Sequence, residues 1–237
     1  MTSDVARDLA PTGVLRASIN LGNPVLAQGT ATDPSGVTVD IAREIGARLG
    51  LPVELVCFDA ARKSFEALTS DVADICFMAV EPARADEVAF TAPYVVIEGV
   101  FALPVDSPVT TPAEVDRPGV RIGVKQGSAY DLYLTRTIEH ATLVRGEDGV
   151  QAFVDEGLDV AAGIRQPMTA FVEAHPQTRL VPERFMQIQQ AVGTTKGRRP
   201  ETVAWLSGVV EELKAGGFVA EALERSGRGD VTVAPPA

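Results

Sequence analysis

Residues 74–94, which have the sequence DICFMAVEPARADEVAFTAPY, contain the pattern that decides the fold of this chain. Residues 74–78, which are apolar after Asp74, predict a buried strand. Pro82 suits the first turn of a short helix, because a backbone N–H at that position would have no helical partner in any case. Arg84 lies in this turn, so the pattern places an arginine directly after a buried strand.

Away from this stretch, short apolar strands alternate with amphipathic helices, which is typical of α/β proteins with largely parallel sheets. In the clearest helix, residues 38–49, Ile41, Ile45 and Leu49 recur every four residues before Gly50 ends the pattern. Further helices are expected at 64–68, 128–139, 150–156, 167–174, 200–215 and 217–226. Further strands are expected at 14–19, 51–58, 95–103, 120–124, 141–144, 158–162, 178–181 and 186–192.

Residues 104–118 interrupt this alternation with four prolines among Asp, Ser and Thr, a composition typical of a connector. Because the alternation then begins again, we expect two Rossmann-like α/β lobes joined by two extended hinge strands, near 100–105 and 187–191. The discontinuous lobe one would comprise residues 1–103 and 190–237, and lobe two residues 104–189. A ligand would bind between them, since domain interfaces often bind small molecules. The tail at 231–237 is expected to be loose.

The composition excludes several classes of partner. Hydrophobic residues make up 46% of the chain and charged residues 22%, which are ordinary values for a globular protein. A net charge of −11 argues against nucleic acid as a partner, because phosphate binding needs clustered cations. A local cluster of cations can still bind a small anion. No run of 18 apolar residues is present to span a membrane.

The N-terminal segment bears on localisation. Residues 1–14 contain Asp4, Arg7 and Asp8 and no apolar core, so they do not resemble a secretory signal. Two alternatives remain open from the sequence: a cytoplasmic protein, or an exported one whose signal is missing from this sequence.

The stretch at 74–94 closely resembles the most recognisable segment of the family 3 solute-binding proteins, which serve ABC importers of polar amino acids. In that family a strand leads to Pro-x-Arg, a short helix and Phe-Ser/Thr-x-Pro-Tyr. Four further segments match the family pattern in order, at 36–42 (GVTVDIA), 68–74, 106–124 and 125–130 (KQGSAY). The resemblance covers nearly the whole chain. It implies the type II periplasmic-binding-protein fold, a periplasmic location and ligand binding without covalent chemistry.

The resemblance also implies which residues bind the ligand. Arg84 matches the arginine that binds the ligand carboxylate, a role that suits a guanidinium because it donates two parallel hydrogen bonds. Without the resemblance, the favoured interpretation of Arg84 would be a surface helix arginine paired with Glu81 or Glu87. The other matching positions are Asn20, Phe77 and Ala79 in lobe one and Lys125, Gly127, Ser128 and Ala129 in lobe two.

The chain departs from the family where amino-acid binders hold the ligand ammonium. No carboxylate occupies the expected position within 159–167, and a cation, Arg165, is adjacent to it. Asn20 replaces the acidic residue at the end of the first strand. With Arg84 and Lys125, Arg165 adds to the positive charge, which favours a dicarboxylate or other organic acid. Glu81 is the opposing consideration, because it could replace the missing carboxylate or neutralise Arg84.

Other chemistry finds little support. The two histidines, His140 and His175, are expected on the surface and give Ser128 no partner for a Ser-His-acid arrangement. Cys57 and Cys76 are expected to be free, buried thiols without metal-ligand spacing. No nucleotide-binding motif is present, so no cofactor is expected, and because the sequence contains no visible metal-ligand cluster, no metal is expected. Trp205 lies among apolar residues at helical spacing and is expected in the core.

These features predict a non-enzymatic, monomeric binding component of an ABC-type importer. It would bind a small anionic ligand, an organic acid or amino acid, by hinge closure and would deliver it to a permease. Two alternatives remain. One is an enzyme similar to cyclohexadienyl dehydratase, in which Arg84 binds a carboxylate and Glu81 is the general acid. The other is a ligand-sensing module in the cytoplasm.

Overall fold

The computed structural model describes residues 2–237, which form two compact units of the α/β class. Unit 1 comprises the chain up to Val96 together with Gln189–Ala237, and unit 2 comprises Ile97–Ile188. Two strands, β6 (Val88–Pro104) and β11 (Met186–Thr195), run from one unit into the other. The predicted α/β class is confirmed. The expected lobe boundaries and hinges stay predictions, and the first crossing between the compact units comes earlier along β6 than the expected hinge at 100–105.

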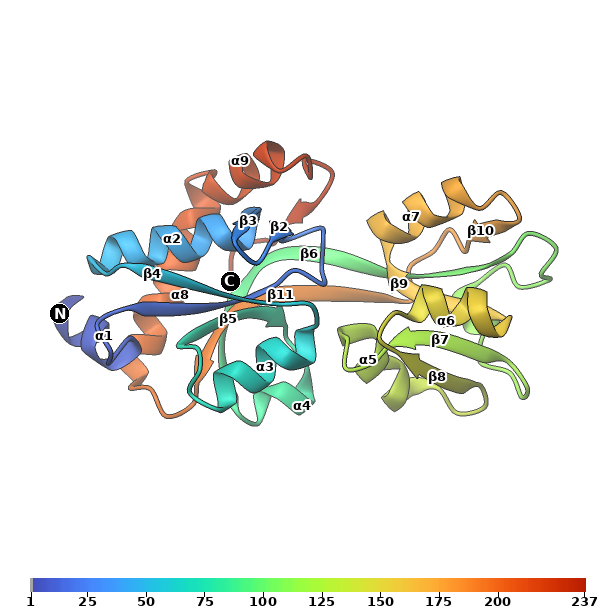
Figure 1. The fold of residues 1–237 in the computed structure, drawn as a ribbon, viewed down its shortest axis with the longest axis horizontal. Coiled ribbons are helices and arrows are strands. Elements are labelled where there is room, and N and C mark those ends of the chain that lie inside the picture. Colours follow the sequence, from blue (N-terminus) through green and yellow to red (C-terminus); the bar gives the residue numbers. More distant parts are fainter. Residues whose placement is uncertain (1) are drawn as a thin grey trace. The chain divides into compact units, whose positions relative to one another are not determined.

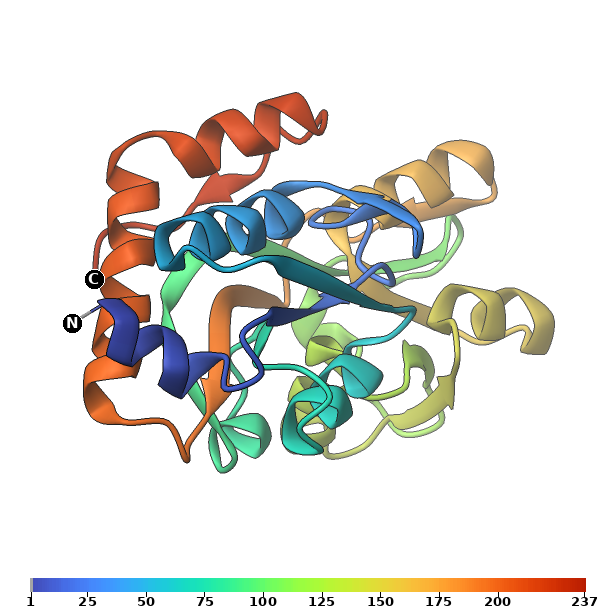
Figure 2. The same ribbon diagram turned by 60° about the vertical axis from the view of Figure 1, so that its left-hand side comes forward.

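Unit 1 is built on parallel strands in the order β4–β1–β5, beside which β11 runs antiparallel to β5. Helices α2 and α9 cover one face of this sheet and α3 covers the other (Figures 1 and 2). Its strands are β1 (Leu15–Asn20), β2 (Gln28–Thr30), β3 (Asp33–Ser35), β4 (Val53–Phe58), β5 (Ile75–Ala79) and β12 (Thr232–Val233). Its helices are α1 (Thr2–Leu9), α2 (Val37–Leu49), α3 (Ala61–Thr69), α4 (Pro82–Ala85), α8 (Pro200–Ala215) and α9 (Phe218–Arg225).

Helix α2 shows how the sequence pattern produces the packing of unit 1. Ile41, Ile45 and Leu49 recur on one side of the helix and are buried. Gly50 ends the helix in the left-handed region, with φ at 67°, and its N–H donates to the carbonyls of Ala47 and Gly46. A residue without a Cβ adopts this conformation at little cost, which explains why the predicted stop is a glycine.

Unit 2 repeats the parallel arrangement with β7 between β8 and β9. Strand β9 also pairs antiparallel with β6, and α6 lies along β7 and β8 (Figure 1). The unit has its own core, which contains Val100, Ala102, Phe153, Leu158, Ala161 and Met168. Its elements are a 3₁₀ turn (Pro112–Glu114), β7 (Arg121–Lys125), α5 (Ala129–Thr137), β8 (Thr142–Gly146), α6 (Gly149–Glu156), β9 (Val160–Ile164), α7 (Arg165–Ala174) and β10 (Thr178–Leu180).

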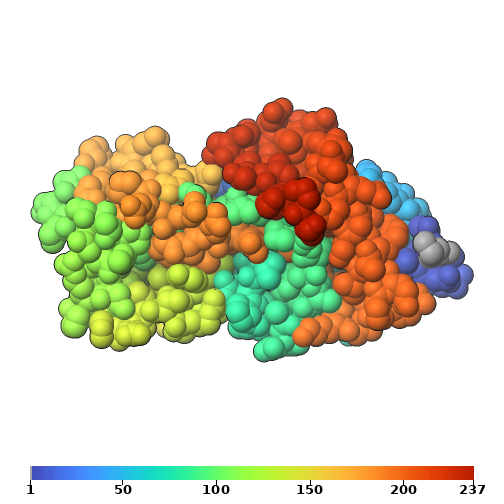
Figure 3. Space-filling model, turned by 180° about the vertical axis from the view of Figure 1, so that it is seen from behind, coloured from blue at the N-terminus to red at the C-terminus, as the bar shows by residue number. Residues whose placement is uncertain are grey.

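The tail of the chain differs from its predicted form. The expectation of a loose tail at 231–237 is wrong, because β12 pairs antiparallel with β6, Thr232 opposite Val96 and Val233 opposite Val95. In Figure 3 the C-terminal residues, in dark red, lie against α8. Val231 and Ala234, on either side of β12, are buried. The strand pairing and this burial hold the tail in place despite its proline-rich composition.

Smaller differences concern single helices. Helix α1 has no counterpart among the predicted elements, and α7 begins at Arg165 rather than at Pro167. Trp205, expected in the core, is only half-buried. No helix within residues 2–237 is both long and apolar enough to cross a lipid bilayer.

A buried carboxylate joins three strands of unit 1. Asp74 is fully buried just before β5, and its oxygens accept hydrogen bonds from the backbone N of Arg16 at 2.9 Å and from the Nη2 of Arg16 at 2.7 Å. The carbonyl of Asp74 accepts a hydrogen bond from Thr194 on β11 at 2.8 Å. A buried charge is tolerated only when paired in this way. Asp74 therefore fixes β1, β5 and β11 relative to one another.

We expect Asp74→Asn to lower the free energy of unfolding by about 2–4 kcal/mol, because it leaves the Arg16 guanidinium partly buried without its counter-charge. Asp33→Asn, which removes an exposed carboxylate in the same unit, should change it by less than about 0.5 kcal/mol. Urea denaturation followed by circular dichroism measures both. Equal stability of the two variants would show that the ion pair does not organise the sheet.

Candidate functional site

In unit 1 the candidate residues gather where parallel strands end. Asn20 is the last residue of β1 and Ala79 the last of β5, and these two strands are neighbours in parallel register. Arg84 lies in α4, the short helix that follows β5. Ligands of open α/β sheets bind beyond the carboxyl ends of the strands, because the loops and helix starts there are free to vary. The structure thus places Asn20, Ala79 and Arg84 at the edge of unit 1 where a ligand is expected.

Arg84 is a buried cation, with 4% of its surface exposed. Its Nη1 donates a hydrogen bond to the carbonyl of Ala79 at 3.2 Å, which holds the guanidinium against the end of β5. Burial lowers the pKa of Arg84, and the nearby carboxylate of Glu81, which is also buried, opposes that effect. An arginine nevertheless stays charged in a protein. Arg84 and Glu81 therefore form a charge-balanced pair rather than an isolated positive charge.

The other candidates in unit 1 contribute in different ways. The side chain of Phe77 is buried and packs edge-on against Tyr94, with ring centroids 6.1 Å apart. Phe77 could therefore reach a ligand only through its backbone. The half-buried side chain of Asn20 accepts a hydrogen bond from the N–H of Gly22 at 3.0 Å, which orients its amide at the strand end.

In unit 2 the loop at 125–129 joins the end of β7 to the start of α5. Gly127 has a φ of 69°, in the left-handed region, which turns the chain sharply into the helix. Ser128 is the N-cap of α5 and accepts a hydrogen bond from the N–H of Asp131. Ala129 is the first helical residue and is buried. Lys125, Gly127, Ser128 and Ala129 are thus contiguous at one strand end.

Asp131, which the sequence analysis did not select, organises this loop. Its side chain is buried, with Oδ2 accepting from the N–H of Gly127 at 2.8 Å and Oδ1 accepting from the Nε of Arg145 at 2.9 Å. The position three residues after a serine N-cap is a common one for an acidic residue. That pattern in the sequence could have indicated Asp131. One N–H of the loop is therefore already bonded within unit 2.

Arg165 begins α7 at the carboxyl end of β9, and its charge is partly neutralised. Its Nε donates to Glu98 on β6, and its Nη2 donates to the carbonyl of Pro182 at 3.1 Å. Glu98 also accepts from the Nη1 of Arg184 at 2.9 Å. Partial burial raises the pKa of Glu98, but the hydrogen bonds from Arg165 and Arg184 outweigh burial and hold the pKa below its ordinary value.

Glu98 is the functional candidate that sequence reasoning missed. It is the one charged residue in the extended run at 95–103, which is the signal that could have drawn attention to it. The two arginines and one carboxylate of this cluster leave a single excess positive charge.

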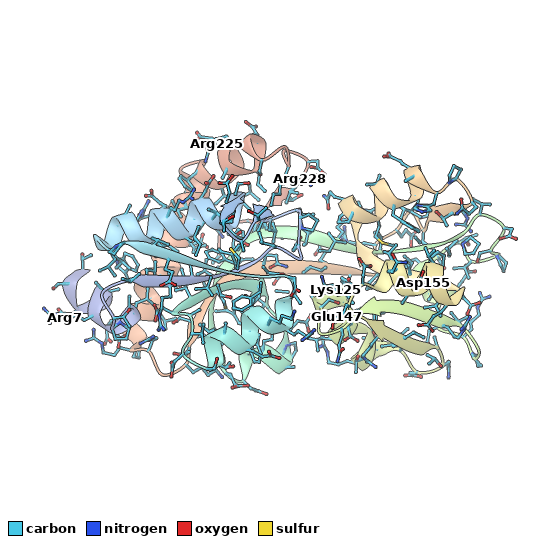
Figure 4. The ribbon with its side chains drawn as sticks, viewed as in Figure 1. Arg7, Lys125, Glu147, Asp155, Arg225 and Arg228 are labelled. Atoms are coloured by element: carbon cyan, nitrogen blue, oxygen red, sulfur yellow. The ribbon has the colours of Figure 1, made fainter. Side chains whose placement is uncertain are left out.

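Lys125 also has an acidic residue nearby. Strands β7 and β8 end in parallel register with Lys125 opposite Gly146, and Glu147 follows directly. Figure 4 shows Lys125 and Glu147 at this same end of the two strands. Arg84, Lys125 and Arg165, which the sequence suggested as an excess of positive charge, therefore each have an acidic residue nearby.

Comparison with known proteins places the chain in a family. The model of the bacterial extracellular solute-binding proteins, family 3, matches residues 20–227. The chain belongs to this family. Family 3 members are solute-binding proteins rather than enzymes, which agrees with the non-enzymatic role expected from the sequence.

Solved structures with the type II periplasmic-binding-protein fold resemble this family 3 chain over most of its length. The cysteine-binding protein from Campylobacter jejuni is 20% identical with a TM-score of 0.79, covering 98% of this chain and 100% of its own. The solute receptor for L-cysteine of Neisseria gonorrhoeae is 22% identical with a TM-score of 0.78, covering 94% and 92%. The arginine-bound form of truncated ArgBP from T. maritima is 22% identical with a TM-score of 0.70, covering 86% and 98%. No match to this chain was found among the curated proteins.

Residues 2–237 contain no group of three or more His, Cys, Asp or Glu side chains suited to a metal ion. Both cysteines of this family 3 protein are free thiols. Cys76 is buried in β5, and Cys57 is half-buried in β4, where full burial was expected. Burial raises the pKa of the Cys76 thiol to about 12, and it also raises the pKa of Cys57.

We expect Ellman's reagent at pH 8 to modify Cys57 in the folded protein and to leave Cys76 unmodified, because thiolate is the reactive form and a thiol with a pKa of about 12 is neutral at that pH. Both thiols should react in about 6 M guanidinium chloride, because unfolding exposes both side chains to the reagent. The Cys57→Ser variant should show no reaction when folded. Equal rates for both thiols in the folded protein would contradict this assignment.

Proposed function

We propose that this chain is the substrate-binding component of an ABC-type importer, located in the periplasm, and that Arg84 binds the carboxylate of a small organic acid or amino acid. The observation that supports this proposal most directly is the buried guanidinium at the carboxyl end of β5, within the segment matched by family 3. The hydrogen bond to the carbonyl of Ala79 orients the planar guanidinium of Arg84, and a guanidinium can donate two parallel hydrogen bonds to a carboxylate.

The second part of the proposal is closure of the two units around the ligand. The chain crosses between the units twice, along β6 and β11, so each crossing is a short extended segment. Unit 2 presents its loop at 125–129 and the start of α7 at strand ends, as unit 1 presents Arg84. A ligand bound first at Arg84 would gain contacts with unit 2 only in a closed state, and this difference in affinity would favour closure. A membrane permease would then recognise the closed form.

The third part of the proposal is that the ligand carries a net negative charge. Glu81 balances Arg84, whereas Arg165 and Arg184 share the single carboxylate of Glu98. The excess positive charge near Arg165 favours a ligand with a second negative group over a cationic one. The competing possibility is a neutral or cationic amino acid, because similar structures are named for L-cysteine and for arginine.

Substitution of Arg84 tests the carboxylate site. By isothermal titration with L-cysteine, L-arginine, L-glutamate and succinate, we expect the wild type to bind at least one of these. Arg84→Lys should weaken that binding about 10–100-fold, because a lysine cannot donate the paired hydrogen bonds. Arg43→Lys, an exposed change on α2, is the matched control and should bind as the wild type does. Unchanged affinity in Arg84→Lys would remove the basis of the proposal.

A second titration tests the charge of the ligand. Arg165→Gln should weaken binding of succinate or L-glutamate about tenfold through loss of one charge-assisted contact and should leave binding of L-cysteine nearly unchanged. Arg117→Gln, an exposed change in unit 2, should alter neither. Preferential binding of L-arginine by the wild type would show that the ligand is not an anion, while leaving the role of Arg84 intact.

A further inference from the structure

The tail of the chain is attached to β6 directly before that strand leaves unit 1. Strand β12 pairs with Val95 and Val96, and the N–H of Ala234 donates to the carbonyl of Tyr94 at 3.0 Å. We call residues 231–235 the C-terminal strap. Its residues Val231 and Ala234 are buried, with 7% and 4% of their surfaces exposed. The strap is therefore a packed part of unit 1, and its pairing ends where the crossing begins.

Lys214, on α8, holds the strap to β6 from the side. Its Nζ donates to the carbonyl of Pro93 at 3.1 Å and to the carbonyl of Pro235 at 2.9 Å. Glu211 provides the counter-charge, at 2.6 Å from Nζ. Only 4% of the Lys214 side chain is exposed. Such a buried ammonium is stable only while its partners stay in place, so movement of either the strap or β6 would be unfavourable.

Beyond the crossing, β6 is held again by unit 2. Gly99 pairs with Ile164 of β9, and the neighbouring Glu98 is fixed by its ion pairs with Arg165 and Arg184. Ile97 is the first residue of unit 2, and it lies between Val96, the last residue paired with the strap, and Glu98. Strands β10 and β11 are also hydrogen-bonded neighbours of β6.

We propose that the C-terminal strap is a brace that confines bending of β6 to the residues around Ile97. Bending requires rotation about backbone dihedrals, and residues held by ladder hydrogen bonds rotate only if those bonds break. Hinges form at a few residues that absorb changes in the backbone dihedrals, and neither β12 nor β9 pairs with Ile97. The inference depends on the proposed function only in requiring that the two units move relative to each other. The strap would then set the amplitude of this movement.

The proposal is tested by pulsed EPR on the ligand-free protein. Spin labels are attached to Glu66→Cys on α3 and Glu156→Cys on α6, both exposed positions, after both native cysteines are replaced by alanine. Removal of Val231–Ala237, and separately Lys214→Met, should each broaden the distribution of distances between the labels beyond the spread of repeat preparations. Removal of Pro236–Ala237 alone and Lys196→Met, an exposed lysine of unit 1, are the matched controls and should leave it unchanged.

An unchanged distribution in folded Lys214→Met and in the folded truncated protein would overturn the proposal, and so would equal broadening in the controls. If the longer truncation does not fold, as judged by circular dichroism, Lys214→Met decides the outcome. Because no ligand is present, the result does not depend on which compound the protein binds. Failure of all four test compounds to bind, with strap-dependent broadening, would instead count against the proposed ligand alone.

Discussion

The shared strand β6 is the constraint on which the rest of the structure depends. Its residues Val88–Pro104 belong partly to unit 1 and partly to unit 2, and nearly every backbone N–H and C=O of a buried strand needs a partner. Each unit therefore supplies its own strands to a part of β6, β12 in unit 1 and β9 in unit 2. Glu98 lies on β6 and Arg165 follows β9, so the pairing of these two strands also brings these two charged groups of unit 2 together.

The site follows from a second regularity, the direction of the parallel strands. In unit 1 the ends of β1 and β5 place Asn20 beside the start of the segment that contains Arg84. In unit 2, Lys125 lies at the end of β7 and Arg165 directly after the end of β9, and these two strands are parallel neighbours. In both units the candidate residues follow the carboxyl ends of parallel strands, which is where ligands of open α/β sheets bind. The chemistry of each edge then depends on a few side chains.

Much of this arrangement could be predicted from sequence, because it depends on local patterns. The four-residue repeat in 38–49, ended by Gly50, requires only neighbouring residues to be interpreted, and so does the strand before Arg84. The pairing of Glu98 with Arg165 joins residues 67 positions apart, and it depends on the register of β6 against β9. No local pattern contains that register. The strap was missed for the same reason, since its partner on β6 is distant in the chain.

Ion pairs between residues distant in the sequence, such as Glu98 with Arg165, also change the charge inferred near the candidate residues. Counting Arg84, Lys125 and Arg165 along the sequence suggests a strongly positive site, whereas in the folded chain each has an acidic neighbour, which in the case of Arg165 is shared with Arg184. A guanidinium has five N–H donors, and Glu98 and Pro182 engage only Nε and Nη2 of Arg165. The Nη1 of Arg165 therefore lies outside these two hydrogen bonds. The carboxylate of Glu98 lowers the positive potential at Arg165 while it holds the guanidinium in one orientation, so the net charge there is smaller than the number of cations suggests.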